Sequence, residues 1–180
     1  VPMRLFIAIE LPASFKNEVA RIQKEVKQMS SGGRFVPRDN FHITLHFIGE
    51  SEDLVGAPEA MAQAVRGIRP FELHLGKYMN LEKGSRGCTS VLRVLGEMDE
   101  LRAMYESLES ALSDRGFSRE RKQFTPHITL GRSVELDELC MGELEELCPN
   151  ASMQVRSITL FESTREGSRM VYTPLHRERF

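Results

Sequence analysis

The tetrapeptide His-Ile-Thr-Leu occurs twice in this chain of 180 residues, at positions 42–45 and again at positions 127–130. The two histidines lie 85 residues apart, which is close to half of the chain. Among the pairs that five histidines can form, a chance match of the next three residues is expected on the order of once in a few hundred such chains. The repeat therefore predicts two similar halves.

Each copy of the repeat alternates polar and apolar residues in the manner of a strand. Successive side chains of a strand point to opposite faces, so His42 and Thr44 are expected to share one face. The opposite face is expected to carry the apolar side chains Ile43, Leu45 and Phe47. The second copy predicts the same arrangement. Each strand would then anchor itself by its apolar face and present an imidazole and a hydroxyl group on the other.

The rest of the pattern predicts one order of elements in each half of the chain. Strands are expected at 4–11, 42–49, 71–81, 88–95, 127–131, 153–162 and 169–176. Helices are expected at 14–29, 52–66, 97–115 and 136–147, with loops at 34–40 and 117–126. We infer an α+β fold that is bilobal, with two pseudo-symmetric lobes of antiparallel sheet, helices on the outside and a central cleft. Residues 1–180 are interpreted as a single domain of two interleaved lobes.

Composition restricts the classes of protein to which the chain can belong. A net charge of −2 argues against a dedicated nonspecific nucleic-acid coat, although it allows recognition of a nucleic-acid end. The three cysteines lack paired short spacings, so neither a disulfide framework nor a zinc site is expected. No apolar run approaches a membrane span or a signal peptide, and we expect a cytoplasmic protein with no membrane partner. Val1 and Pro2 precede Met3, a plausible start, and are interpreted as extra residues.

Two imidazoles that face one cleft are suited to paired proton transfer. An unperturbed histidine titrates near pH 6.5, so one ring can act as a base while the other acts as an acid. A phosphate ester fits between them, because Thr44 and Thr129 can donate hydrogen bonds to its non-bridging oxygens. We expect this chemistry to need no metal and no cofactor, and to give a bell-shaped dependence of rate on pH.

The two motifs, His42-Ile-Thr44-Leu45 and His127-Ile-Thr129-Leu130, resemble those of the two-histidine (2H) phosphoesterase superfamily. The opening Met-Arg-Leu-Phe-Ile-Ala-Ile, the segment around the first motif and the closing Ile-Thr-Leu-Phe-Glu-Ser are similar to the RNA 2′,3′-cyclic phosphodiesterases, also called 2′-5′ RNA ligases. The resemblance covers essentially the full length of the chain.

The resemblance implies hydrolysis of RNA 2′,3′-cyclic phosphate ends to 2′-phosphates, with 2′-5′ RNA ligation as a side activity. It assigns His42 as proton donor, His127 as proton acceptor, and Thr44 and Thr129 as phosphate ligands. The expected partners are RNA with a 2′,3′-cyclic phosphate end, tRNA fragments among them, or small nucleotides, and the protein is expected to be a monomer.

Two further residues are candidates for substrate binding. Strict alternation places His46 on the same face as His42 and Thr44, where many relatives of this family carry lysine. Arg132 follows the second motif, but alternation places it opposite His127, so a bulge at Gly131 would be needed to aim it into the cleft.

Two other functions are compatible with the same residues. A module that binds RNA ends or nucleotides without turnover would hold phosphate with the same threonines, but it would not require both imidazoles. A phosphodiesterase acting on 2′-5′ oligoadenylate or on small cyclic nucleotides would use the same chemistry. The motifs do not separate these substrates.

Overall fold

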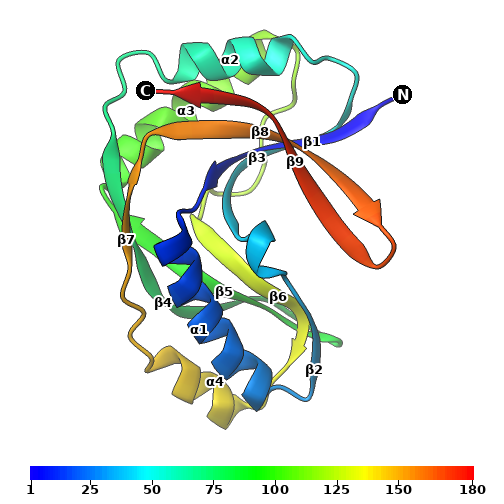
Figure 1. The fold of residues 1–180 in the computed structure, drawn as a ribbon, viewed down its shortest axis with the longest axis vertical. Coiled ribbons are helices and arrows are strands. Elements are labelled where there is room, and N and C mark those ends of the chain that lie inside the picture. Colours follow the sequence, from blue (N-terminus) through cyan, green and yellow to red (C-terminus); the bar gives the residue numbers. More distant parts are fainter.

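The computed structural model describes residues 1–180 except for the side chain of Lys83, and its strands form two antiparallel sheets (Figure 1). The first sheet has the order β3-β1-β8-β9, with bounds His42–Ser51, Met3–Glu10, Ser157–Glu166 and Arg169–Arg179. The second has the order β2-β6-β5-β4-β7, with bounds Gly32–Phe35, His127–Glu135, Gly87–Gly96, Phe71–Gly84 and Ser152–Val155. The two His-Ile-Thr-Leu strands therefore lie in different sheets, as β3 and β6.

Four α-helices lie outside the sheets: α1 (Ala13–Met29), α2 (Gly56–Ala64), α3 (Met98–Asp114) and α4 (Glu138–Glu145). Figure 1 shows α2 and α3 on the side of the first sheet and α1 and α4 on the side of the second. The helix that follows β1 thus covers the other sheet, and the helix that follows β5 covers the first. The expectation of an α+β fold with two lobes of antiparallel sheet and outer helices is confirmed.

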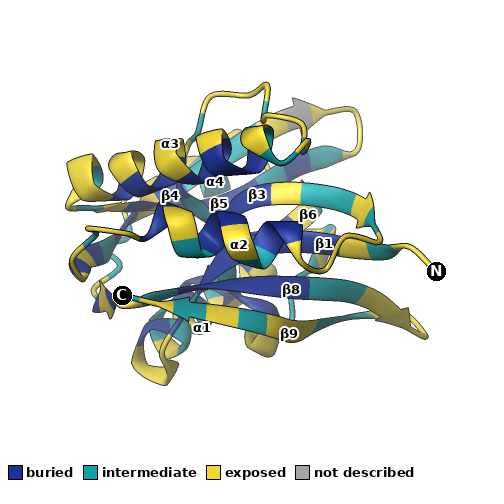
Figure 2. Ribbon diagram, turned by 90° about the horizontal axis from the view of Figure 1, so that it is seen from above, coloured by how far each residue is buried: buried dark blue, intermediate teal, exposed yellow. Residues whose placement is uncertain are grey.

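Apolar side chains at helical and strand spacing meet in one buried cluster that includes both lobes. On α1 the buried stripe is Phe15, Val19, Ile22 and Val26, spaced as one face of a helix. Figure 2 shows the same pattern in the helices, which are buried on the side facing the sheets and exposed on the other. The two sheets are therefore held at a fixed separation by a shared core.

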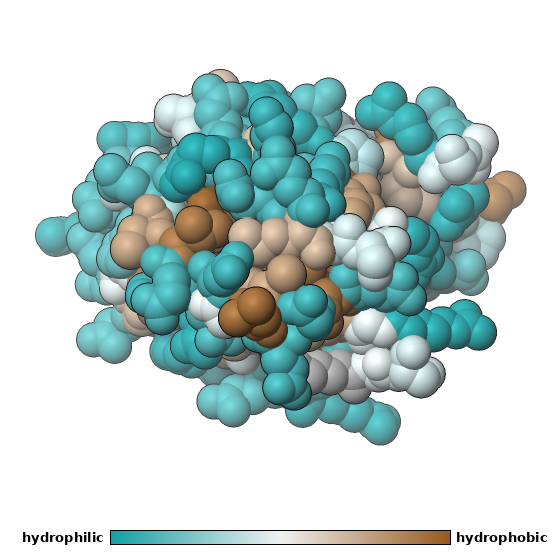
Figure 3. All heavy atoms as spheres, turned by 90° about the horizontal axis from the view of Figure 1, so that it is seen from below, coloured by the Kyte–Doolittle hydropathy of each residue, from teal (hydrophilic) through white to brown (hydrophobic). Residues whose placement is uncertain are grey.

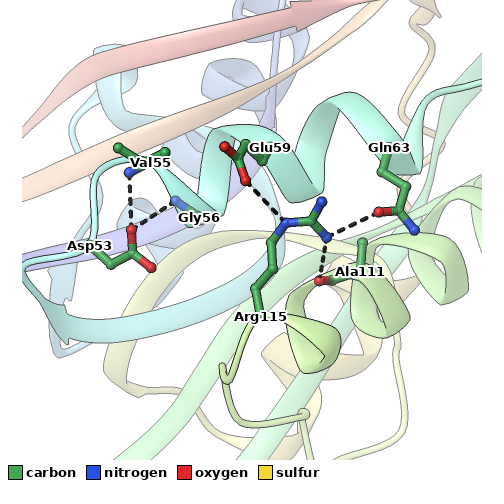
Figure 4. A network of polar contacts seen from close by, with 7 residues as sticks. All are labelled: Asp53, Val55, Gly56, Glu59, Gln63, Ala111 and Arg115. Carbon is green, nitrogen blue, oxygen red and sulfur yellow. Dashed lines mark hydrogen bonds and ion pairs between the residues drawn. The ribbon is translucent and has the colours of Figure 1, made fainter.

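Helices α2 and α3 are joined by a polar contact at their ends (Figure 4). Arg115, just after α3, donates hydrogen bonds to the side-chain oxygen of Gln63 and to the carbonyl of Ala111, each at 3.0 Å.

Asp53 accepts hydrogen bonds from the backbone N–H groups of Val55 and Gly56 at the start of α2. This acceptor satisfies donors that the first turn of a helix leaves without partners, which explains why α2 begins at 56 rather than at 52.

The structure corrects the sequence prediction at two other places. Strand β2 lies where a loop was expected, because its Gly32 and Gly33 give no strand pattern and its partner β6 supplies the pairing. The strand expected at 153–162 is two strands, β7 and β8, which belong to different sheets.

The surface seen from below in Figure 3 is mainly hydrophilic, with a small group of apolar side chains on the side where Figure 1 shows α4. Leu139 on α4 is 74% exposed. Within the described chain, no helix combines the length and the hydropathy required to cross a bilayer.

Candidate active site

A β-bulge follows each threonine of the repeat. In β3, Thr44 pairs with Ala8 but His46 pairs with Ile7, so Leu45 is the extra residue. In β6, Leu130 is extra in the same way between Thr129 and Gly131. A bulge of this kind changes which face of the strand the following residues point to. The internal symmetry of the chain therefore extends beyond the four repeated residues to an irregularity of the backbone.

The bulges exchange the faces of the residues that follow them. Phe47 and Arg132 hold equivalent positions, 85 residues apart, and both line the cavity between the lobes. The bulge that the sequence required in order to aim Arg132 into the cleft is therefore present. The prediction for the first strand is wrong, because His46 is 2% exposed and points away from the cavity, while Phe47 is 59% exposed.

The ring of His46 is part of a buried polar network. Its Nδ1 lies 2.5 Å from the carboxylate of Glu109 on α3, and this carboxylate also accepts a hydrogen bond from the backbone N–H of Glu120. The carboxylate of Glu120 in turn accepts from the backbone N–H of Phe47. His46 thereby connects the bulge of β3 to a helix and to the loop at 117–126, and a direct contact with substrate is not supported.

The bulge of β6 has a polar support of its own. Gln23 of α1 is 5% exposed, and its amide nitrogen donates to the carbonyl of Leu130 at 3.0 Å and to that of Val36 at 2.7 Å. The backbone N–H of Val36 also donates to the carbonyl of Leu130. Each bulge is thus contacted by a helix behind its sheet, either directly at the extra residue or at the residue after it.

His42 begins β3 and is held at both ring nitrogens. Nδ1 lies 2.7 Å from the backbone carbonyl of Asn40, two residues earlier, and Nε2 lies 2.8 Å from the hydroxyl of Thr44. Because a carbonyl can only accept, Nδ1 carries the proton, and Nε2 of the neutral ring accepts from Thr44. The side chain of Asn40 is itself fixed by a 2.8 Å hydrogen bond to the carbonyl of Met170 on β9.

His127 begins β6 and has the same kind of anchor. Its Nδ1 lies 2.6 Å from the backbone carbonyl of Thr125, again two residues earlier. The proton therefore lies on Nδ1, and Nε2 is left for a group in the cavity. The sequence motif did not predict these hydrogen bonds to backbone carbonyls, because every residue has a backbone carbonyl and the pattern of side chains does not show where it lies.

Burial, which is the largest cause, acts together with the nearby positive charge of Arg132 and the ring of His127 to lower the pKa of His42 to about 4. The carbonyl of Asn40 acts in the opposite direction, since it stabilises the protonated ring. In the absence of a bound anion, His42 is therefore neutral at pH 7. A phosphate placed between the rings would raise its pKa.

The cavity has a volume of about 880 Å³ and is lined by residues of both lobes. The residues proposed from the sequence that line it are His42, Thr44, His127, Thr129 and Arg132. The structure brings these five together and leaves His46 outside. Among the described residues, no three His, Cys, Asp or Glu side chains lie close enough together to hold a metal ion.

Aromatic rings pack against His42, and Tyr172 among them lines the cavity. The ring of Tyr172 meets that of His42 edge-on at 5.4 Å between centroids, and Phe6 lies 5.1 Å from His42. Burial raises the pKa of the Tyr172 hydroxyl. Tyr105 and Phe124, which also line the cavity, stack at 4.0 Å between ring centroids with nearly parallel planes. The sequence did not identify these aromatic residues as neighbours, because the four of them come from four separate segments of the chain.

Comparisons with known proteins agree with one another. The model of the 2′-5′ RNA ligase superfamily matches residues 11–167. The RNA 2′,3′-cyclic phosphodiesterase of Escherichia coli (strain K12) is 30% identical over 183 residues, covering 98% of this chain and 96% of that protein. The enzyme of the same name from Aeropyrum pernix is 31% identical over 159 residues, covering 83% and 88% of the two chains. The crystal structure of E. coli LigT complexed with 3′-AMP aligns with a TM-score of 0.76 and 28% identity, covering 99% of this chain and 98% of that one.

Proposed function

This chain belongs to the 2′-5′ RNA ligase superfamily, and from that premise we propose that it hydrolyses the 2′,3′-cyclic phosphate at an RNA end to a 2′-phosphate. One observation carries the proposal. His42 and His127 line one cavity, and each ring is held by a backbone carbonyl two residues before it. A phosphate between them would meet one imidazole from each lobe.

In the proposed reaction His127 is the base and His42 is the acid. Nε2 of His127 takes a proton from water as the water oxygen bonds to phosphorus. The bond from phosphorus to the ribose 3′ oxygen breaks, and Nε2 of His42 gives that oxygen a proton. A 2′-phosphate and a free 3′ hydroxyl result, and at the end of the step His42 has lost one proton and His127 has gained one.

The assigned acid must be protonated before it can act, although the pKa of His42 is about 4 in the empty site. The negative charge of the cyclic phosphate favours the protonated ring, so we infer that substrate and proton bind together. When Nε2 is protonated it no longer accepts from Thr44, and that hydroxyl becomes available to donate to a phosphate oxygen.

Thr129 and Arg132 complete the phosphate site in this proposal. Thr129 lies on the same face of β6 as His127, and Arg132 enters the cavity because of the bulge. A guanidinium group can donate two parallel hydrogen bonds to a phosphate and offsets the charge that develops on it. This set supplies an acid, a base and charge stabilisation, so we propose that the reaction proceeds without a metal and within one protein chain.

The same steps lead to 2′-5′ ligation when a 5′ hydroxyl replaces water. His127 would deprotonate that hydroxyl, and His42 would again protonate the departing 3′ oxygen, leaving a 2′-5′ phosphodiester. We propose ligation as a side activity, because water is always present at far higher concentration than a second RNA end.

The test is to incubate the protein in EDTA with an oligonucleotide that ends in a 2′,3′-cyclic phosphate. The expected product carries a 2′-phosphate only, which a 2′-specific phosphatase assay distinguishes from a 3′-phosphate. The double variant His42→Ala, His127→Ala is the control for contaminating nucleases. A folded wild-type protein that binds the oligonucleotide without turnover would contradict the proposal and favour a binding module.

A further inference from the structure

A second hollow of about 420 Å³ opens beside the cavity, under the turn between β4 and β5. It shares Arg34 and Arg132 with the cavity, so the two spaces lie next to each other. The turn adds Ser85 and Arg86, and β6 adds Ser133. Three arginines and two serines therefore line a space next to the proposed phosphate site.

Among the described side chains, no ion pair balances the arginines of this second hollow. The ion pairs of arginine among the described side chains involve Arg21, Arg38, Arg115 and Arg177, and none of the three arginines of the hollow. The carboxylate of Glu82 also lines the hollow, but it is bonded to Lys122 at 3.1 Å. The hollow is thus cationic in a chain whose net charge is −2.

Two of these arginines are placed directly opposite each other. Arg34 of β2 and Arg132 of β6 are cross-strand partners in the antiparallel pair. Like charges in that position destabilise a sheet, because their side chains project from neighbouring points on one face. A bound anion would remove this repulsion, and arginine is well suited to phosphate because its donors match two phosphate oxygens.

We propose that the second hollow binds the phosphodiester that precedes the cyclic phosphate of an RNA substrate, an inference that rests on the proposed function. The terminal ribose would span from the cavity to the hollow, with its cyclic phosphate at the imidazoles and its 5′ phosphate at Arg86. Arg34 and Arg132 would lie between the two phosphates. The substrate is then an oligonucleotide, since a mononucleoside cyclic phosphate has no group for this position.

Arg86 provides the test, because it lines the hollow and not the cavity. The substrates are a trinucleotide that ends in a 2′,3′-cyclic phosphate and the corresponding mononucleoside 2′,3′-cyclic phosphate. The change Arg86→Ala should lower kcat/KM for the trinucleotide about tenfold more than for the mononucleoside, mainly through KM. Arg69→Ala removes the same charge from an exposed position that lines neither space. It should leave the ratio of the kcat/KM values for the two substrates unchanged.

A chemical change of the substrate gives an independent readout. A methylphosphonate at the linkage before the terminal nucleotide removes the charge of that phosphodiester. For the wild type, the methylphosphonate should lower kcat/KM by the same factor as Arg86→Ala lowers it for the unmodified trinucleotide. In the Arg86→Ala variant, the methylphosphonate should cause little further decrease in kcat/KM. The dependence of log kcat/KM on log salt should also become shallower by about 0.7 in the variant, the value for one phosphate contact with a single strand.

The proposal would be overturned if Arg86→Ala lowered kcat/KM equally for the trinucleotide and the mononucleoside, or for neither. It would also be overturned if the decreases in kcat/KM caused by Arg86→Ala and by the methylphosphonate were additive. If the wild type turned over neither substrate, the proposed function would fail, and the hollow would still be tested by fluorescence polarisation. A labelled trinucleotide with a 2′-phosphate should then bind less tightly to Arg86→Ala than to wild type, and equal binding would refute the site.

Discussion

The low pKa of His42 makes stability depend on pH in a way that can be calculated. Unfolded His42 takes up a proton below about pH 6.5, whereas the folded ring stays neutral until the pH falls to about 4. Between these values the unfolded chain binds more protons, so this stabilising contribution is fully present above pH 6.5 and is lost as the pH falls. Linkage gives a loss of about 2 kcal/mol between pH 7 and pH 5, and about 3 kcal/mol below pH 4.

The perturbation is His42→Asn, which removes the titration. Urea unfolding of wild type and variant at pH 7 and at pH 5 gives the difference in their free energies of unfolding at each pH. We expect this difference to shift by about 2 kcal/mol in favour of the variant at the lower pH. The midpoint of the His42 titration in the folded protein can be measured directly by NMR, and it should lie near pH 4.

A second variant and a ligand test the cause of the low His42 pKa. Arg132→Gln should raise the midpoint of the NMR titration, because the charge of Arg132 is one of those that lower the pKa of His42. The surface change Arg69→Gln should leave the midpoint unchanged. Inorganic phosphate should raise the midpoint in wild type. A midpoint near 6.5 in the free protein, or a stability difference that does not change with pH, would refute the reasoning.

The supports of the two bulges give further predictions. Glu109→Ala should lower the free energy of unfolding by about 3 kcal/mol, because it leaves a buried imidazole without its partner, while the exposed Glu106→Ala on the same helix should change it little. Gly131→Ala should destabilise by about 1 to 3 kcal/mol, since its Cβ would lie 2.9 Å from the ring of Phe35, and it should also slow turnover. The control Gly142→Ala has open space in the helix α4 and should stabilise by about 0.5 to 1 kcal/mol, so urea unfolding that showed equal effects at both glycines would contradict the role of the bulge.

Much of the fold and of the site could be read from the repeat. Alternation placed His42 and Thr44 on one face correctly, and the repeat predicted two lobes of sheet around a cleft. Strict alternation fails after Thr44, because the bulge at Leu45 breaks the period of two. His46 and Phe47 therefore point to the faces opposite to those predicted. The bulge depends on contacts with helices from elsewhere in the chain, and no local pattern encodes them. That residues 1–180 form one domain stays a prediction, which the shared core supports.

The central claim is that His42 and His127 act as an acid and base pair across one phosphate. It is tested most directly by the pH dependence of kcat/KM on a 2′,3′-cyclic phosphate oligonucleotide, measured for wild type, His42→Ala and His127→Ala. We predict a bell for wild type, loss of the alkaline limb in His42→Ala, loss of the acidic limb in His127→Ala, and rates lower by about 10² to 10⁴ in each variant. A bell that keeps both limbs in either variant would contradict the account.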